Sequence, residues 1–143
     1  MYEEVVHARG HENVSAEHAS TFEVTSDDWL TPAGDCILAV EADRVPADFD
    51  EAFVDACRDE TATITAILEV RTDGGESFEQ RIEGRGHPDL SFENERSHVG
   101  RTSDYVDDRT VLVGAEGAAG DVDRDIVSAL ADGGEVTFTL RVE

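Results

Sequence analysis

The sequence predicts a mainly β domain of the α+β class, with a β-sandwich or jelly-roll-like core of seven to eight strands and two short peripheral helices. Three observations support this prediction. Several segments alternate apolar and polar residues, which is the period-two pattern of a half-buried strand. Two other segments repeat apolar residues at helical spacing. The 143 residues contain no linker, so residues 1–143 are expected to form a single domain.

Three strands are expected in the first part of the chain, at residues 6–11, 21–25 and 36–40. The first carries apolar residues at alternate positions and ends at a glycine and a histidine. In the second, Phe22 and Val24 alternate with polar neighbours, which predicts one buried face. The third is a short apolar run after a turn signal at residues 31–34, as expected for a buried strand.

A helix is expected next, at residues 48–58, where aromatic and small apolar residues share one stripe and acidic residues the other. An aspartate at its start can cap it. The following segment, residues 61–72, is rich in isoleucine, threonine and valine and is expected to form a strand. The turn residues Asp73-Gly74-Gly75-Glu76 then close a hairpin to a strand at residues 78–82.

The least regular stretch is residues 86–108, and a long loop of this kind is often functional. Two more strands are expected at residues 110–113 and 135–142, the second with clean alternation. Between them, residues 122–131 place their large apolar side chains on one helical face, and a glycine pair follows. This segment is expected to be the second helix.

The composition predicts a protein that works in concentrated salt. The chain has 34 acidic residues and 11 basic ones, the basic residues are all arginine, and the net charge is −23. Such a surface repels itself in ordinary buffer, whereas molar salt shortens the screening length to about 3 Å. A bias toward GC-rich codons explains arginine in place of lysine but not the 34 acids. We therefore expect a halophilic source and a cytoplasmic location.

Several functional classes are disfavoured by the same sequence. No apolar run is long enough to span a membrane, and the start of the chain lacks the pattern of a signal peptide. Cys36 and Cys57 are far apart, so reduced thiols are expected. Without lysine there is no phosphate-binding loop of the Walker type. The strong negative charge makes nucleic acid an unfavourable partner.

Arginine and histidine residues near the irregular stretch are candidates for binding an anion. A planar guanidinium group binds carboxylate or phosphate through two parallel hydrogen bonds, and nearby hydroxyls add donors. The alternative is that each arginine forms an ordinary surface ion pair with one of the many carboxylates. The candidate ligand-binding residues are Arg85, His87, Arg101, Ser103 and Arg109.

A second set of candidates suggests a metal site. His11 and His18 flank a short polar segment, and in a hairpin their Cβ atoms would lie about 5 Å apart. Two imidazoles at that separation can share a divalent metal if a carboxylate such as Asp35 or Glu17 completes the site. The alternative is that these histidines bind loop backbone. No tight metal-binding motif is present, and the sequence leaves a divalent metal cofactor open.

Six parts of the sequence, distributed over nearly the whole chain, carry a resemblance to a known family: Gly10–Val14, His18, Thr25, Leu30–Ile37, Gly84–Pro88 and Arg109–Thr110. They resemble an archaeal family, the domain of unknown function 371 family. The resemblance implies a single mainly β domain of sandwich type in an archaeal cytosol, and together with the acidic composition it implies a halophilic member. It implies no activity.

Three hypotheses for the function follow from the sequence. The first is a small cytosolic protein that binds an anionic ligand, such as a phosphorylated metabolite, in a cleft lined by histidine and arginine. The second is a metal-dependent hydrolase in which His11, His18 and Asp35 hold the metal and His87 acts as acid or base. The third is a structural or interaction subunit. The sequence leaves a homo-oligomer open in each case.

Overall fold

The structure, a computed structural model, describes residues 1–143 and is mainly β, with eight strands and two short helices. The helices are α1 (Glu51–Cys57) and α2 (Arg124–Ala131), and a single 3-10 turn precedes each. The strands are β1 (Tyr2–Arg9), β2 (Thr21–Thr25), β3 (Ile37–Ala39), β4 (Thr63–Arg71), β5 (Ser77–Arg85), β6 (Ser97–Arg101), β7 (Thr110–Leu112) and β8 (Glu135–Val142).

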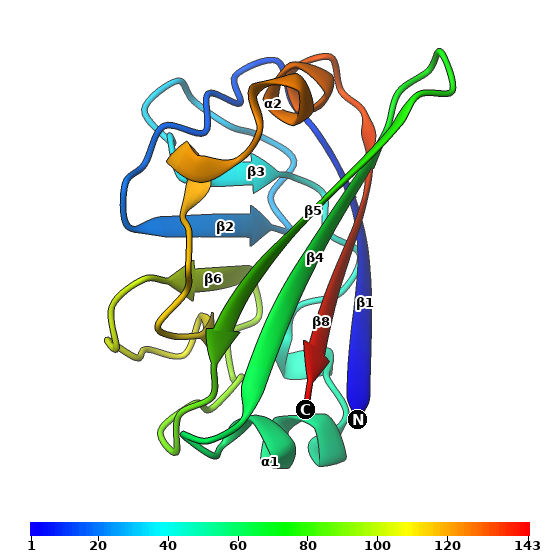
Figure 1. Cartoon of the computed structure of the whole chain (residues 1–143). Helices are drawn as coiled ribbons and strands as arrows, with labels where there is room; N and C mark the ends of the chain where they lie inside the picture. Colours follow the sequence, from blue (N-terminus) through cyan, green and yellow to red (C-terminus); the bar gives the residue numbers. More distant parts are fainter.

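The strands form two sheets of four. One sheet has the order β1-β8-β4-β5 and is antiparallel throughout. The other has the order β3-β2-β6-β7, and in it only β2 and β6 pair antiparallel. Figure 1 shows β2, β3 and β6 running across the direction of β4, β5 and β8. The chain ends lie side by side because Tyr2 of β1 pairs with Val142 of β8.

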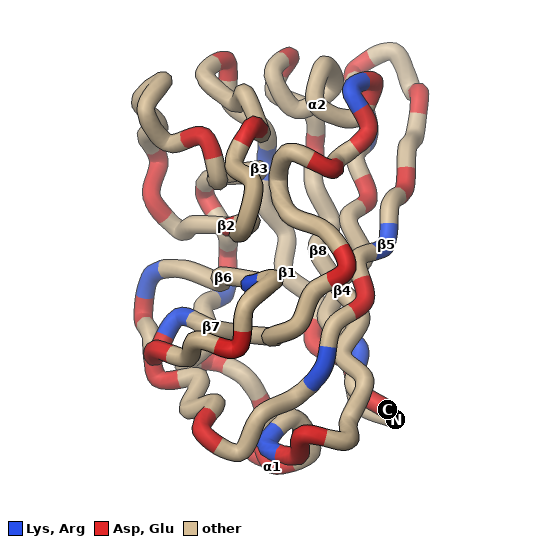
Figure 2. Tube along the Cα trace, turned by 60° about the vertical axis from the view of Figure 1, so that its left-hand side comes forward, with Lys and Arg blue, Asp and Glu red and all other residues tan.

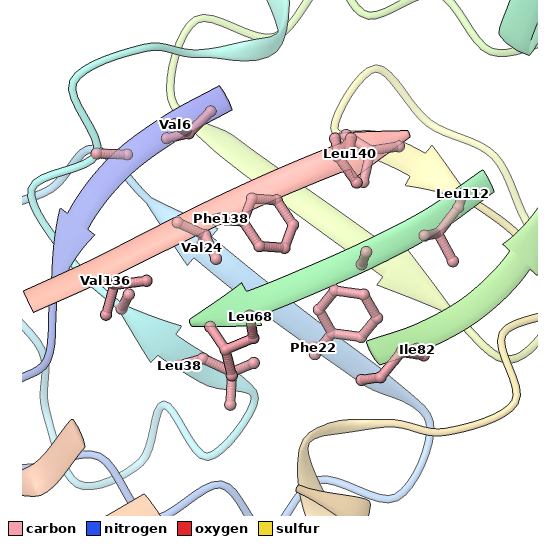
Figure 3. Packing of buried hydrophobic residues seen from close by; sticks show 14 of the residues in the cluster. Val6, Phe22, Val24, Leu38, Leu68, Ile82, Leu112, Val136, Phe138 and Leu140 are labelled. Atoms are coloured by element: carbon pink, nitrogen blue, oxygen red, sulfur yellow. The ribbon is translucent and has the colours of Figure 1, made fainter. Parts of the chain in front are cut away.

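The inner faces of the two sheets share one hydrophobic core. The apolar residues of β8 alternate inward and meet those of β2, as Figure 3 shows for Phe138 and Phe22. These two rings pack edge to face with their centroids 6.4 Å apart. Burial of each phenylalanine contributes about 2–3 kcal/mol. Gly100 of β6 has to be glycine, because a Cβ there would lie 2.2 Å from the Phe22 ring.

Two connecting segments bond the edge strands of the first sheet, β1 and β5, to the second sheet. Along one edge, Asp43 N donates to His7 O of β1 (2.9 Å) and Ala42 N donates to Thr25 O of β2 (3.0 Å). The segment that follows β3 therefore ties β1 to the second sheet.

The opposite edge is tied in the same way. Arg85 N of β5 donates to Val113 O (2.8 Å), and Gly114 N donates to Ser103 O (2.9 Å), just beyond β6. Gly114 has a positive φ of 58°, a conformation that glycine adopts without strain. The segment after β7 thus joins the end of β5 to the end of β6 and fixes both arginine-bearing strands in place.

The sequence predicts most of these elements, but two predictions are wrong. The stretch 86–108 is not loop throughout, because it contains β6, a central strand of the second sheet. Four of the five residues of β6 are buried, so its sequence lacks the alternation that marks a half-buried strand. The hairpin expected between His11 and His18 is also absent. Residues 10–20 form the connection from β1 to β2, which lie in different sheets.

Burial of β6 gives His98 an unusual environment. Its ring is fully buried and stacks on Phe49, with centroids 5.3 Å apart. His98 Nε2 donates to Arg44 O at 2.9 Å, since a carbonyl oxygen only accepts. His98 Nδ1 has no hydrogen-bond partner. Desolvation lowers the pKa of His98 to about 4, although its bond to the Arg44 carbonyl acts in the opposite direction.

Candidate functional site

The outer face of the second sheet brings together several charged and hydroxyl-bearing residues. Cross-strand pairing places Thr21 opposite Arg101 and Glu23 opposite Val99. Figure 2 shows basic residues beside β6 and β7, on a chain that carries acidic residues along its whole length. We call the group formed by Arg101, Asp107, Arg109 and Thr110 the Asp107 cluster.

The Asp107 cluster consists of two guanidinium groups that share one carboxylate. Asp107 Oδ2 accepts hydrogen bonds from Arg101 Nη2 and Arg109 Nη2, both at 2.9 Å. Arg101 Nε donates to Thr110 Oγ1 at 2.9 Å. The Arg101 side chain is only 11% exposed, whereas that of Arg109 is 43% exposed. Two further carboxylates, those of Glu23 and Asp108, act on Arg109 from nearby.

The backbone around Asp107 explains why the carboxylate is so well fixed. Asp107 Oδ1 accepts from Arg109 N at 3.0 Å, and the Thr110 hydroxyl accepts from Asp107 N at 3.0 Å. Partial burial alone would raise the pKa of Asp107. Hydrogen bonds from the side chain and backbone of Arg109 and the charge of Arg101 outweigh this effect and lower the pKa to about 2. The hydrogen bond to Asp107 in turn raises the pKa of Arg109.

A second polar group borders the cluster on the same face. The Cys36 thiol donates to Glu23 Oε1 at 3.8 Å, a distance suited to sulfur. Partial burial, with the negative charges of Glu23 and Asp35, raises the pKa of Cys36. Because the thiolate is the nucleophilic form, this cysteine is held in its unreactive state. Both cysteines of the chain are free thiols.

His18 is fixed by the chain at the start of β2. Its Nδ1 accepts hydrogen bonds from Thr21 N at 3.1 Å and Ser20 N at 3.3 Å, and lies 3.0 Å from Thr21 Oγ1. A ring nitrogen that accepts from backbone amides has to be unprotonated, so the ring proton of neutral His18 sits on Nε2. This matches the alternative in which the histidine binds loop backbone.

The structure does not gather the three predicted metal ligands into a site. Asp35 and His18 are neighbours through the backbone, because Asp35 O accepts from His18 N at 3.2 Å. His11 uses its Nδ1 to accept from Asn13 N at 3.0 Å, and it borders a hollow with Gly133 near the end of α2. No three histidine, cysteine, aspartate or glutamate side chains form a group that could hold a metal ion.

The five predicted ligand-binding residues are also distributed over more than one place. Arg101 and Arg109 meet in the Asp107 cluster. Arg85 lies against Gly114, and Gly114 is bonded to Ser103. His87 lies at the end of α1, where its backbone N donates to Cys57 O at 3.1 Å.

None of these five residues lines the main surface hollows, which have volumes of about 210 to 390 Å³.

Sequence reasoning missed the residue at the centre of the cluster. Among 34 acidic residues, Asp107 has no distinguishing neighbour apart from its place two residues before Arg109. An aspartate that bonds the backbone amide two residues on is a recognised turn, and this spacing is the one signal that points to Asp107. Glu23 likewise becomes notable only through its contact with Cys36.

The comparisons with known proteins identify relatives without an assigned activity. A family model described as "Domain of unknown function (DUF371)" matches residues 6–143. An uncharacterized protein of Methanocaldococcus jannaschii is 37% identical over 138 residues, which cover 96% of this chain and 98% of that protein. In the structure no helix is long and apolar enough to cross a membrane.

Proposed function

The chain belongs to the family described as Domain of unknown function (DUF371), and we propose that it is a binding protein for a small anionic ligand, which Arg101 and Arg109 receive through a phosphoryl or carboxylate group. The observation that carries the proposal is the sharing of one carboxylate by two guanidinium groups. These two fixed arginines lie together on a protein whose surface is otherwise strongly acidic.

The geometry of the Asp107 cluster suits this role. The hydrogen bonds within it use Nε and Nη2 of both arginines and leave Nη1 of each without a partner. Arg109 is exposed enough for a ligand to reach it, and Arg101 is already fixed by Thr110 and Asp107. Fixed donors lose little side-chain entropy when a ligand binds. An arginine fork also fits the two oxygens of a carboxylate or phosphate.

The proposal also covers where the protein works in the cell and how its two sheets are arranged. We place the protein in the cytoplasm of a halophilic archaeon, which is supported by the net charge of −23, the absence of lysine and the archaeal relative. In molar salt the long-range repulsion between the acidic surface and an anion is screened, so the contacts of the cluster decide binding. A β-sandwich arrangement of the sheets is supported by the single core between their inner faces.

A second candidate function, an interaction subunit, is favoured by one observation on the same face. Trp29 and Tyr105 are 55% and 60% exposed, and an arginine side chain lies over each ring. Exposed aromatic and arginine side chains are enriched in protein interfaces. Co-purification of a partner that is lost on Tyr105→Ala would favour this candidate over small-ligand binding.

Isothermal titration tests the leading proposal. The protein is titrated with inorganic phosphate, nucleoside monophosphates, sugar phosphates and small carboxylates in about 2 M potassium chloride, where screening is strong. At least one of these anions is expected to bind with a Kd below about 1 mM. Arg109→Gln is expected to weaken that binding by about tenfold or more, which corresponds to about 1.4 kcal/mol.

The matched control is Arg141→Gln, which removes an arginine of the first sheet that pairs with Glu3. This variant is expected to bind as the unaltered protein does. The proposal is overturned if no anion of the panel binds more tightly than about 1 mM, or if Arg109→Gln and Arg141→Gln change the affinity equally.

A further inference from the structure

The outer edge of β5 is open over half of its length. At the end of the strand, Arg85 N donates to Val113 O and Glu83 O accepts from Glu116 N. In an antiparallel strand alternate residues direct their backbone groups to the same side. Glu79 and Arg81 therefore direct N–H and C=O groups away from β4, and neither residue has a backbone hydrogen bond on that side.

A hollow runs beside this open edge. It has a volume of about 390 Å³ and lies between β5 and the start of α2, two elements that adjoin in Figure 1. Phe78 and Ile126 form its apolar part. Gln80 holds the hollow in shape, because its side chain donates to Asp121 O at 3.1 Å and accepts from Asp123 N at 2.8 Å.

The charged residues around the hollow are almost all acidic. A neighbouring hollow of about 360 Å³ continues along α2 and shares Phe78 and Asp125 with the first. Of the acidic residues that line the two hollows, only Glu79 forms an ion pair, with Arg81. We call the six acidic residues that line the two hollows the acidic flank; they are Glu76, Glu79, Asp121, Asp123, Asp125 and Asp132.

We propose that the open edge of β5 receives an extended, basic segment of a partner protein, which adds a strand to the first sheet. The free backbone groups at Glu79 and Arg81 offer the hydrogen bonds that strand addition uses. The side chains of an added strand alternate between the two faces of the sheet. Apolar residues of the partner cover Phe78 and Ile126, and its basic residues meet the acidic flank.

Charge complementarity selects this occupant over a second copy of the chain. A copy that paired through the same edge would bring its own acidic flank against this one, and salt screens such repulsion only in part at contact distance. A segment rich in arginine or lysine is attracted to the same acids, and the backbone hydrogen bonds fix its register. This inference concerns the first sheet and does not depend on anion binding at the Asp107 cluster.

Nuclear magnetic resonance with a defined peptide tests the inference. The probe is a capped peptide of about ten residues that alternates arginine and valine, long enough for a typical strand. It is added to the full chain in about 1 M potassium chloride, where long-range electrostatics are screened. We expect saturable binding and slower amide hydrogen exchange at Glu79 and Arg81, with no change at Arg85, whose amide is already bonded.

Two variants test whether peptide binding needs both the free backbone groups of β5 and the negative charges of the acidic flank. Arg81→Pro removes an outward N–H at an edge position that tolerates proline, and it is expected to weaken binding about tenfold or more. Glu79→Gln with Asp125→Asn is expected to weaken binding several-fold. The matched control is Glu95→Gln with Asp104→Asn, two exposed acids outside the flank, and it is expected to bind unchanged.

The hydrogen-exchange measurement on the unaltered chain tests strand addition even if Arg81→Pro fails to fold. The inference is overturned if the peptide leaves exchange at Glu79 and Arg81 unchanged. It is also overturned if a peptide alternating glutamate and valine binds equally well, or if the flank and control variants weaken binding to the same extent.

Discussion

The Asp107 cluster and the acidic flank use carboxylates in opposite ways. In the cluster, one aspartate is shared by two arginines and also accepts hydrogen bonds from the Arg109 backbone and the Thr110 hydroxyl. On the flank, six acids border two hollows and a single arginine, Arg81, pairs with one of them. The first arrangement contributes local order and keeps two guanidinium groups side by side. The second leaves negative charge to be screened by salt or by a basic partner.

The comparison shows that net charge alone says little about where this protein can bind. A chain at −23 still contains a position where two arginines lie together on one shared carboxylate. The difference lies in burial: Arg101 is 11% exposed and its partners are fixed, whereas the flank residues Glu76 and Glu79 are exposed. Partly buried pairs are screened far less by salt than exposed charges are.

Salt is expected to produce the largest effect, because it acts on every unpaired acid at once. The melting temperature is expected to rise by about 10 °C between about 0.1 M and 2 M potassium chloride, which corresponds to about 3 kcal/mol for a chain of this size. Differential scanning calorimetry measures it. A melting temperature that is flat over this range would show that the acidic surface does not destabilise the fold.

Lowering the pH is expected to change the free energy of unfolding through His98, by nearly as much as salt does. The folded-state pKa of His98, about 4, lies below the ordinary value of 6.5, so the unfolded chain takes up the proton first as the pH falls. The stability due to neutral His98 is therefore present above pH 6.5 and is lost between pH 6.5 and 4, by about 3 kcal/mol. Urea unfolding in about 2 M salt, where repulsion between acids is screened, measures this loss.

The matched variant is His98→Gln, whose amide can still donate to Arg44 O but does not titrate. Its free energy of unfolding is expected to change much less over the same pH range. At low salt the effect of His98 is opposed, because protonation of the crowded acids toward pH about 4.5 relieves their repulsion. The same pH dependence in both proteins would contradict the assignment to His98.

The variant Asp107→Asn tests how much the shared carboxylate of the Asp107 cluster stabilises the fold. Arg101 then keeps its charge in a nearly buried position without a counter-ion, so the free energy of unfolding is expected to fall by about 2 kcal/mol at high and low salt alike. Urea unfolding measures the change, with Asp104→Asn as the control at an exposed position. A loss that disappears in about 2 M salt would mean that the cluster behaves as an ordinary surface ion pair.

The smallest effect is expected from a variant of the acidic flank, and it is an increase in stability rather than a loss. Glu76→Gln with Asp132→Asn removes two unpaired charges, one of them at the C-terminal end of α2, where a negative charge is unfavourable. Stability is expected to increase by about 1 kcal/mol in about 0.1 M salt and by almost nothing in about 2 M salt. Equal changes at both salt concentrations would indicate a local effect rather than unpaired charge.

The sequence predicted the strands that have one buried face. The cleanly alternating segment at 135–142 is β8 to the residue, and the strand at 21–25 is β2. It did not predict β6, because a strand buried on both faces has no alternation to read. The helix expected at 48–58 is shorter in the structure, where Pro46–Asp48 forms a separate 3-10 turn before α1.

The candidate site was predictable only in part. Arg101 and Arg109 were identified because arginine is the residue that suits a bound anion, and the structure brings them together. Asp107 was not identified, since a partner of this kind is fixed by a turn and by β6 and β7 pairing rather than by composition. His11 and His18 were placed together by a hairpin that the fold replaces with a connection between sheets.

The most direct test of the central claim uses the fact that the protein has eleven arginines and no lysine. The Nε–H resonances of all eleven arginines are followed by nuclear magnetic resonance while phosphate, or the tightest anion from the titration panel, is added in about 2 M potassium chloride. If the Asp107 cluster is the anion site, Arg101 and Arg109 shift together and saturably, while Arg81 and Arg141 stay unchanged. Uniform shifts of all eleven, or none at Arg101 and Arg109, would contradict the account.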